Sequence, residues 1–309
     1  MFNYRKATDR DREFLDALLI LSHDNHEIGV GYPRGDLEDV EFELAENKQT
    51  VNDSFYIIEK ENMDIGIIGE IRDDNYLGLV GPIFSKDFHQ QYVVYDFLDL
   101  FLKKQDYLVK KIGFHVVEDN IALATALDML GAIKKSTHIA MFYEMNNHNA
   151  IDITSSFIEI AEKDNIVLKE IAVLFKKNMF HYGDVSFEDL LDYIDKGYRI
   201  FVAKQDNKIV GAIIWGWFHN LHFGRVEYIC VDQNYRRQGL ALNLLNNTLA
   251  TIRKSISFKE DLNLFHLDLK KENVDAFQLY KKVGFKLNYY SSVYRINLIK
   301  DKVLDENTQ

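Results

Sequence analysis

Several features are scarce in this 309-residue sequence, and each scarcity excludes something. The single cysteine, Cys230, excludes an internal disulfide bond, which fits a reducing cytoplasm. No run of 18 apolar residues is present, so we expect no membrane-spanning helix and no membrane partner. The first residues, MFNYRKATDRDREF, are charged and lack the apolar stretch of a secretion signal. We therefore expect a cytoplasmic protein.

Positive charge is also scarce, but only in one half. The formal net charge of −11 argues against nucleic acid as a partner. Residues 1–150 hold 15 basic and 27 acidic residues, whereas residues 151–309 hold 22 and 21. An anionic ligand would therefore prefer the second half. The acidic segment 35–46 could guide a cationic amine, or it could simply be a solvated helix face.

The two halves resemble each other in sequence. YIIEKENMDIGIIGEI (56–71) and FVAKQDNKIVGAIIWGW (201–217) both read as strand, turn and strand, with an offset of about 145 residues. NIALATALDMLGA (120–132) and NVDAFQLYKKVGF (273–285) both read as helices, with an offset of about 153. We therefore expect a duplicated architecture in which later insertions lengthened the second copy.

Polar residues at 146–149 separate the two copies. We predict a first domain over residues 1–146, a second over 151–300 and a loose tail over 301–309. Helices interspersed among strands and hairpins indicate an α+β fold in each domain. Each domain should contain a mixed, mostly antiparallel twisted sheet flanked by helices.

A glycine turn joins a strand to a helix in the second half, within the stretch EYICVDQNYRRQGLALNLLNN (227–247). The first amides of a helix lack partners and lie at the positive end of its dipole, so they favour phosphate. Gly239 lets a ligand approach the backbone closely, and Ala241 keeps the next turn small. Arg236 and Arg237 add charged donors. This junction has the features of a diphosphate-binding turn.

A second motif follows in NVDAFQLYKKVGF, where Asn273 and Tyr280 lie two helical turns apart and Gly284 ends the helix. With the core Arg236-Arg237-Gln238-Gly239-Leu240-Ala241, this motif resembles the GNAT family of N-acetyltransferases over about residues 151–298. The whole chain resembles the tandem two-domain form of that family. The resemblance implies an enzyme that uses acetyl-CoA as co-substrate.

The same resemblance implies the binding site. Backbone groups near Ile229 and Val231 would pair with the pantetheine arm of the co-substrate. The 236–241 turn would hold its diphosphate, with contributions from Arg236, Arg237, Gln238, Gly239, Leu240 and Ala241. Asn273 and Phe277 would contact it as well, and Tyr280 would lie near the thioester sulfur.

Acetyl transfer needs a base for the amine, a donor for the oxyanion and an acid for the leaving thiolate. Tyr280 is our candidate acid, the alternative being a helix tyrosine that only packs. Glu227 is a candidate base, or else an ion-pair partner that faces solvent. The oxyanion donor would be an amide of a bulged strand near Ile229–Val231.

Other reactive side chains have simpler interpretations. His219 and His222 could face the acceptor, but they are more simply loop histidines, and their spacing does not indicate a metal site. Cys230 is expected to be a packed strand thiol. We therefore expect direct transfer in a ternary complex and no metal.

The first half lacks the key features. At an offset of 147, Tyr92 aligns with Gly239, and at an offset of 153, Leu127 aligns with Tyr280. Pro82 falls opposite Ile229 and removes an amide from the corresponding strand. We therefore expect a degenerate copy without a cofactor site, and one site per chain.

The sequence thus indicates an acyl-CoA-dependent N-acyltransferase acting on a primary amine of a small molecule or peptide. The alternatives are a non-catalytic acyl-CoA-binding sensor and an interaction protein. Acceptor residues are expected in 178–184, in 215–224 and around Tyr289–Tyr294. The chain could be a monomer or a homodimer.

Overall fold

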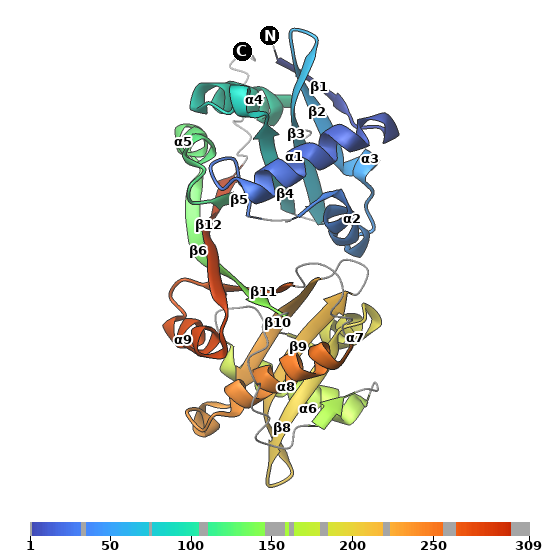
Figure 1. Cartoon of the computed structure of the whole chain (residues 1–309), viewed down its shortest axis with the longest axis vertical. Coiled ribbons are helices and arrows are strands. Elements are labelled where there is room, and N and C mark those ends of the chain that lie inside the picture. Colours follow the sequence, from blue (N-terminus) through green and yellow to red (C-terminus); the bar gives the residue numbers. More distant parts are fainter. Residues whose placement is uncertain are drawn as a thin grey trace, which may run out of the picture. The chain divides into compact units, whose positions relative to one another are not determined.

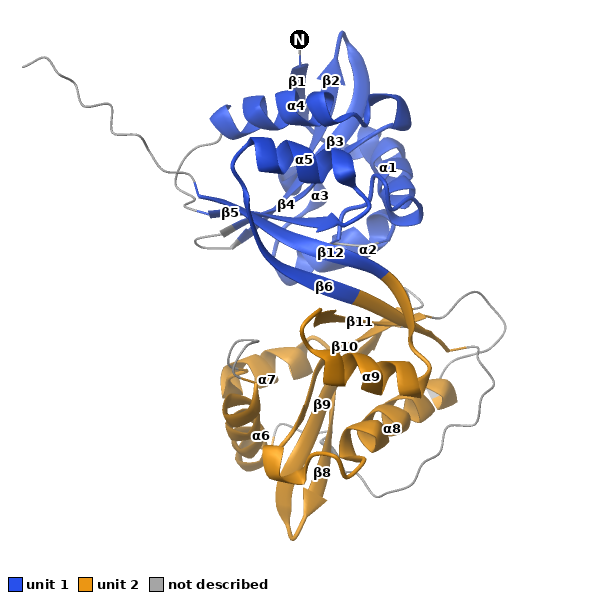
Figure 2. Ribbon diagram, turned by 90° about the vertical axis from the view of Figure 1, so that its left-hand side faces the viewer, with its two compact units in different colours: residues 1–139, 289–309 blue, residues 140–288 orange. Residues whose placement is uncertain are grey.

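The computed structural model describes residues 2–31, 35–73, 76–104, 111–145, 158–160, 164–179, 185–218, 223–255 and 264–297. The chain forms two compact units, shown in different colours in Figure 2. Unit 1 comprises residues 1–139 and 289–309, and unit 2 comprises residues 140–288.

Unit 1 begins with a strand, continues with a group of helices and three consecutive strands, and ends with helices and strands in turn (Figure 1). Its strands are β1 (Phe2–Lys6), β2 (Phe55–Lys60), β3 (Met63–Asp73), β4 (Tyr76–Phe84), β5 (Lys111–Val117) and the first part of β6 (Ile133–Glu144). Its helices are η1 (Asp9–Asp11), α1 (Arg12–Asp24), α2 (Leu37–Glu46), α3 (Val51–Ser54), η2 (Lys86–Phe88), α4 (Gln91–Lys104) and α5 (Ile121–Met129).

Unit 2 repeats this order. Its strands are β7 (Ile158–Ile160), β8 (Arg199–Gln205), β9 (Lys208–Phe218), β10 (Phe223–Val231), β11 (Leu264–Lys270) and the first part of β12 (Lys286–Asn297). Its helices are α6 (Asn165–Asn178), α7 (Phe187–Asp195), η4 (Gln233–Tyr235), α8 (Leu240–Ser255) and α9 (Val274–Val283).

Each unit contains a sheet of the predicted kind. In unit 1 the strands are ordered β1-β2-β3-β4-β5, and in unit 2 the order is β7-β8-β9-β10-β11. Neighbours are antiparallel except for β4 with β5 and β10 with β11, which are parallel. The helices cover the sheets: α1 packs on β3 and β4, and α8 packs on β8, β9 and β10. The predicted α+β class is therefore confirmed.

Strands β6 and β12 each start in one unit and end in the other. Residues Ser291–Asn297 of β12 pair antiparallel with all of β5. Residues 289–297 therefore belong to unit 1, although the sequence assigned them to the second domain. Strand pairing follows the hydrogen bonds that β5 offers, and that long-range choice leaves no local mark in the sequence.

The duplication is visible in the element bounds. β4 and β10 have the same length at an offset of 147, and β6 and β12 have the same length at an offset of 153. β5 and β11 also match at 153, and α5 and α9 begin at that offset. The growing offset localises the insertions to the connections, which tolerate them better than packed elements do.

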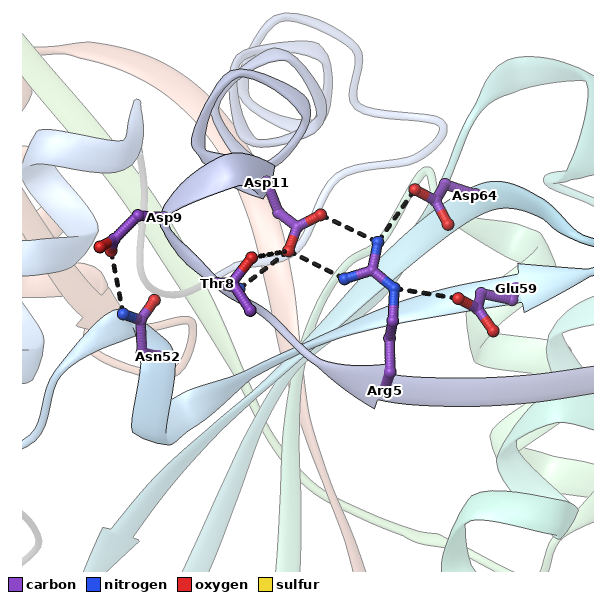
Figure 3. A network of polar contacts seen from close by, with 7 residues as sticks. All are labelled: Arg5, Thr8, Asp9, Asp11, Asn52, Glu59 and Asp64. Atoms are coloured by element: carbon purple, nitrogen blue, oxygen red, sulfur yellow. Dashed lines mark hydrogen bonds and ion pairs between the residues drawn. The ribbon is translucent and has the colours of Figure 1, made fainter.

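A polar network fastens the first strand of unit 1 (Figure 3). Arg5 on β1 binds both carboxylate oxygens of Asp11 in η1, at 2.8 and 2.9 Å. Its guanidinium also contacts Glu59 of β2 at 2.9 Å and Asp64 of β3 at 3.1 Å. Asp11 in turn accepts the Thr8 amide at 2.8 Å. The network ties an edge strand to the helix that follows it.

Large apolar side chains fill the core of each unit. Unit 1 buries Phe55, Phe84, Phe97, Phe101 and Phe114, and unit 2 buries Phe175, Phe201, Trp215 and Phe265. Each such ring removes on the order of 150–250 Å² from water, which makes these residues dominant contributors to stability.

Candidate functional site

The sheet of unit 2 opens beside β10. Strands β10 and β11 pair only from Phe223–Arg225 to Leu264–His266, and no further β10–β11 pair forms among the residues that the structure describes. On its other edge β10 stays paired with β9 as far as Val231. Ile229 and Val231 thus lie on a strand that has parted from β11, as a site for an extended ligand requires.

Glu227 lies at a β-bulge. Val226 pairs with Trp215 and Tyr228 pairs with Ile214, so Glu227 is the extra residue of β10. The predicted bulge near Ile229–Val231 therefore lies two residues earlier. A bulge bends the strand and redirects the side chain of the extra residue.

The carboxylate of Glu227 is held by two neighbours. It forms an ion pair with Arg225 and accepts the Tyr198 hydroxyl at 3.0 Å. Arg225 Nε also donates to that hydroxyl at 2.6 Å, and its guanidinium lies 5.5 Å from the Tyr198 ring centre. The side chains of Glu227 and Arg225 are each 21% exposed. Glu227 is therefore an ion-pair partner, in a half-buried setting that also borders the open part of the sheet.

The glycine turn leads from η4 into α8. Gly239 adopts φ +81°, a conformation that residues with an L side chain rarely adopt, and a Cβ atom there would meet no heavy atom within 4 Å. Its carbonyl accepts the Asn243 amide at 2.9 Å, which begins the helix. Leu240 and Ala241 are the first two residues of α8, so their amides belong to the group that has no intrahelical partner. The turn is therefore open to a ligand and lined by helix amides.

The two arginines of the turn have different roles. Arg236 Nε donates to the Val231 carbonyl at 3.0 Å and so tethers the turn to β10. Arg237 pairs with Asp275 in the first turn of α9 at 2.7 Å, and both side chains are more than three-quarters exposed. Gln238 accepts a hydrogen bond from Gln205 at 3.4 Å. Both arginines are exposed, but Arg236 donates to backbone carbonyls whereas Arg237 forms a surface ion pair, which a charged ligand could replace.

Helix α9 carries the remaining predicted residues. The Asn273 carboxamide oxygen accepts the Ala276 amide at 3.2 Å and caps the helix. The Tyr280 ring is 5% exposed and packs 5.5 Å from Phe285, centre to centre. Phe277 is half-buried, with the Lys281 ammonium 5.7 Å from its ring centre. Gly284 ends the helix at φ +110°, as the sequence predicted.

The thiol of Cys230 is buried and points to the Leu174 carbonyl at 4.0 Å. Burial raises its pKa to about 12, so it is protonated at neutral pH and a poor nucleophile. His219 and His222 lie outside the described residues, as do residues 180–184 of the expected acceptor region. Within the described part of the chain, no group of three or more His, Cys, Asp or Glu is placed to hold a metal.

The corresponding turn of unit 1 is shorter by two residues. Four residues, 236–239, separate η4 from α8, but only His89 and Gln90 separate η2 from α4. The Val94 amide donates to the Gln90 carbonyl at the start of α4, and the Asn243 amide donates to the Gly239 carbonyl at the start of α8. Gln90, and not Tyr92, is therefore the residue that aligns with Gly239. Tyr92 is a solvent-exposed residue of α4. Unit 1 therefore has a two-residue connection in place of the four-residue turn.

Sequence reasoning missed Tyr198, Arg225 and Asp275. Arg225 lies two residues before Glu227, and opposite charges at that spacing on a strand were the only available signal. Tyr198 and Asp275 reach their partners from other elements. The structure also places Tyr289 and Tyr294 of the expected acceptor region in unit 1, where the Tyr289 hydroxyl donates to Gly31 at 3.3 Å.

Solved structures share this two-unit fold. A GCN5-related N-acetyltransferase from Sphaerobacter thermophilus aligns with a TM-score of 0.70 over 96% of this chain and 95% of its own, at 11% identity. A tandem GNAT protein from the clavulanic acid biosynthesis pathway, solved without AcCoA, aligns with a TM-score of 0.66 over 96% and 98%, also at 11% identity. The fold is therefore that of a tandem GNAT protein.

Sequence comparison supplies the family. The family model of the acetyltransferase (GNAT) domain matches residues 196–287. An N-alpha-acetyltransferase of Saccharolobus solfataricus is 31% identical over 153 residues, which cover 42% of this chain and 87% of that protein. One of Sulfurisphaera tokodaii is 34% identical over 97 residues, 28% of this chain and 55% of that protein. The chain belongs to the GNAT family and is an N-acetyltransferase.

No helix in the described part of the chain has both the length and the apolar character to span a membrane.

Proposed function

We propose that unit 2 transfers an acetyl group from acetyl-CoA directly to a primary amine within a ternary complex. The single observation that supports this most is the turn at Gly239, which is open, has a positive φ and leads into the unpaired amides of α8. The residues present fit the co-substrate. Helix amides and Arg237 suit its phosphates, and the separated edge of β10 suits its amide-bearing arm.

Acetyl-CoA supplies the activated acyl group as a thioester, and the chain supplies binding and proton transfer. The Tyr280 hydroxyl would keep its proton at neutral pH, since a tyrosine has a reference pKa near 10, and would donate it to the leaving thiolate. Glu227 would accept a proton from the amine, directly or through water. Amides of β10 after the bulge would stabilise the oxyanion.

We propose that the acceptor is the α-amine of a peptide. Both curated relatives are named N-alpha-acetyltransferases. With a pKa of about 7.7–8.0, roughly a tenth of α-amines are neutral at pH 7, against fewer than about one lysine amine in a thousand. An α-amine therefore needs little help from a base. Glu227 is already paired with Arg225, which makes its carboxylate a weaker base, and a weak base is sufficient for such an amine.

The substitution Gly239→Leu tests the co-substrate site, with Gly131→Leu as the matched control. Gly131 also has a positive φ (+74°), and a Cβ added there would have no neighbour within 4 Å, so both changes introduce similar backbone strain of about 1–2 kcal/mol. We expect Gly239→Leu to weaken acetyl-CoA binding at least tenfold by calorimetry, and Gly131→Leu to leave it unchanged. Equal affinities in the two variants would refute the site.

The acceptor is tested with peptide pairs that share a sequence. One peptide has a free N-terminus and a dimethylated lysine, and the other has a blocked N-terminus and a free lysine. We expect thiol release with the first peptide only. Faster release with the second would overturn the α-amine assignment but leave the acetyl-CoA site in place.

A further inference from the structure

A short segment of unit 1 adds to its sheet as an extra strand. Val30, between α1 and α2, forms an antiparallel bridge with Val116 of β5. The Gly31 amide donates to the His115 carbonyl at 2.8 Å, and the Val117 amide donates to the Gly29 carbonyl at 3.4 Å. We call residues Ile28–Gly31 the inserted segment.

The inserted segment lies in the gap between β4 and β5. One edge of β5 pairs with β12 along its full length, including Val116 with Ser292. The other edge pairs with β4 only as far as Phe114. The bridge at Val116 must therefore use the edge that β4 has left. In unit 2 this same gap, between β10 and β11, is the proposed site of the acetyl-CoA arm.

An asparagine fixes the inserted segment. Asn120 is fully buried, and its Nδ2 donates to the Gly29 carbonyl at 3.1 Å. Its Oδ1 accepts the Leu123 amide at 3.0 Å and lies 2.9 Å from His89 Nε2. At the offset of 153, Asn120 corresponds to Asn273, which caps α9 in the same way. In unit 1, therefore, the Asn120 side-chain amide is bonded to a backbone carbonyl of the inserted segment.

Glycines allow the inserted segment to fit. A Cβ on Gly29 would lie 2.9 Å from Val117 Cγ2, and one on Gly31 would lie 2.9 Å from Ser291 Cβ. Both distances are too short for real side chains. The connection from α1 to α2 has twelve residues, 25–36, whereas that from α6 to α7 has eight, 179–186. Unit 1 therefore has extra chain and the small residues needed to reach into the gap.

We propose that residues Ile28–Gly31 are a built-in substitute for the acyl-CoA arm, filling in unit 1 the strand gap whose counterpart between β10 and β11 is the proposed site of unit 2. This inference rests on the proposed function of unit 2. The shortened turn removes the phosphate site, and the inserted segment forms hydrogen bonds with the free edge of β5 and with the Asn120 side-chain amide. Unit 1 is thereby a permanently closed copy whose site has been converted into core structure.

Hydrogen–deuterium exchange of the intact protein tests the proposal. We expect the amides of Val30, Gly31 and Val117 to exchange slowly without ligand, because each donates a hydrogen bond, to Ser22 Oγ in the case of Val30. Addition of acetyl-CoA should not change them. Peptides covering residues 226–241 should gain protection. Fast exchange at 29–31 without ligand, or protection there only after acetyl-CoA is added, would overturn the proposal.

The substitution Asn120→Asp separates this proposal from the proposed function. It keeps the oxygen that caps α5 but replaces the donor to Gly29 with a repelling carboxylate. We expect exchange at residues 29–31 and 115–117 to rise at least tenfold, with acetyl-CoA affinity unchanged. Unchanged exchange in this variant contradicts the role of Asn120 in holding the segment. If acetyl-CoA protects no part of unit 2, the proposed function fails, while the ligand-free exchange still decides whether the inserted segment is closed.

Discussion

Tyr280 and Tyr143 share the ring of Phe285, with centre distances of 5.5 and 5.4 Å, but only Tyr280 lies on the helix that borders the proposed site. Both tyrosines are nearly buried, at 5% and 3% exposed. The Tyr143 hydroxyl accepts a hydrogen bond from Arg253 at 2.9 Å. Comparing variants of the two tyrosines therefore shows whether Tyr280 acts chemically or only packs.

We expect Tyr280→Phe to lower kcat by about two orders of magnitude, because the leaving thiolate loses its proton donor. KM for acetyl-CoA should stay within about twofold, since the ring remains packed. In steady-state assays, Tyr143→Phe should leave kcat unchanged and lower stability by about 1 kcal/mol. A Tyr280→Phe enzyme with normal kcat would show that this tyrosine only packs.

Asn273 has a structural role as a cap and a proposed role as a ligand donor, and two substitutions distinguish them. Asn273→Asp keeps the oxygen that accepts the Ala276 amide, so the melting temperature should be preserved. It removes the amide donor, so KM for acetyl-CoA should rise about tenfold, equivalent to about 1.4 kcal/mol. Asn273→Ala should raise KM and also destabilise the protein by about 1 kcal/mol. An unchanged KM in both variants would leave capping as the only role.

At the scale of elements, the connections determine what each unit can bind. Units 1 and 2 share their strands and helices, yet the connection before α4 is two residues shorter than its counterpart and lacks the phosphate turn, and the connection before α2 is four residues longer and supplies the inserted segment. Connections change in this way at little energetic cost, because few buried contacts depend on their length.

The junction of β1 and η1 gives a prediction about pH. The Arg5 side chain, by hydrogen bonding to Asp11, lowers the pKa of that carboxyl to about 2 from an ordinary value near 3.9. The resulting stabilisation is present above about pH 4 and is lost as the pH falls toward 2. Because Arg5 is 39% exposed, solvent screening reduces it to about 1–2 kcal/mol.

We therefore expect Asp11→Asn to destabilise unit 1 by about 1–2 kcal/mol at pH 7. The difference between variant and wild type should shrink as the pH falls from about 4 through 2. Urea unfolding at a series of pH values measures it, and Asp9→Asn, which alters the neighbouring contact with Asn52 at 3.0 Å, is the control. A difference that does not depend on pH would contradict the assignment to the Arg5–Asp11 pair.

At the scale of the whole molecule, duplication yields two copies of one fold with one proposed site. Only unit 2 has the glycine turn, and only unit 1 has the inserted segment among the residues that the structure describes. We expect native mass spectrometry to show one acetyl-CoA per chain at saturation. At the lowest concentration that saturates the wild type, the Gly239→Leu protein should be mostly unoccupied. A second bound molecule would mean that unit 1 retains a site.

The sequence predicted a large part of this picture. Strand and helix periodicity gave the α+β class, the Gly239 turn and the α9 motif gave the family, and the changing offset revealed the duplication. The features it missed depend on partners far along the chain. Arg237 pairs with Asp275, and Glu227 with Tyr198, across different elements. The predicted alignment of Tyr92 with Gly239 was wrong by two residues, because the difference in length lies in a connection that has no periodic pattern.

The sequence by itself determined the local chemistry of this protein: which segments form strands and helices, where a positive φ is allowed, and which residue types could bind a diphosphate. These properties depend on neighbours a few positions away. Only the tertiary structure decided that β12 completes unit 1 and that residues 28–31 fill a gap between β4 and β5. Backbone hydrogen bonds between strands are available to any extended segment that reaches them, so geometry and not residue type selects the partner.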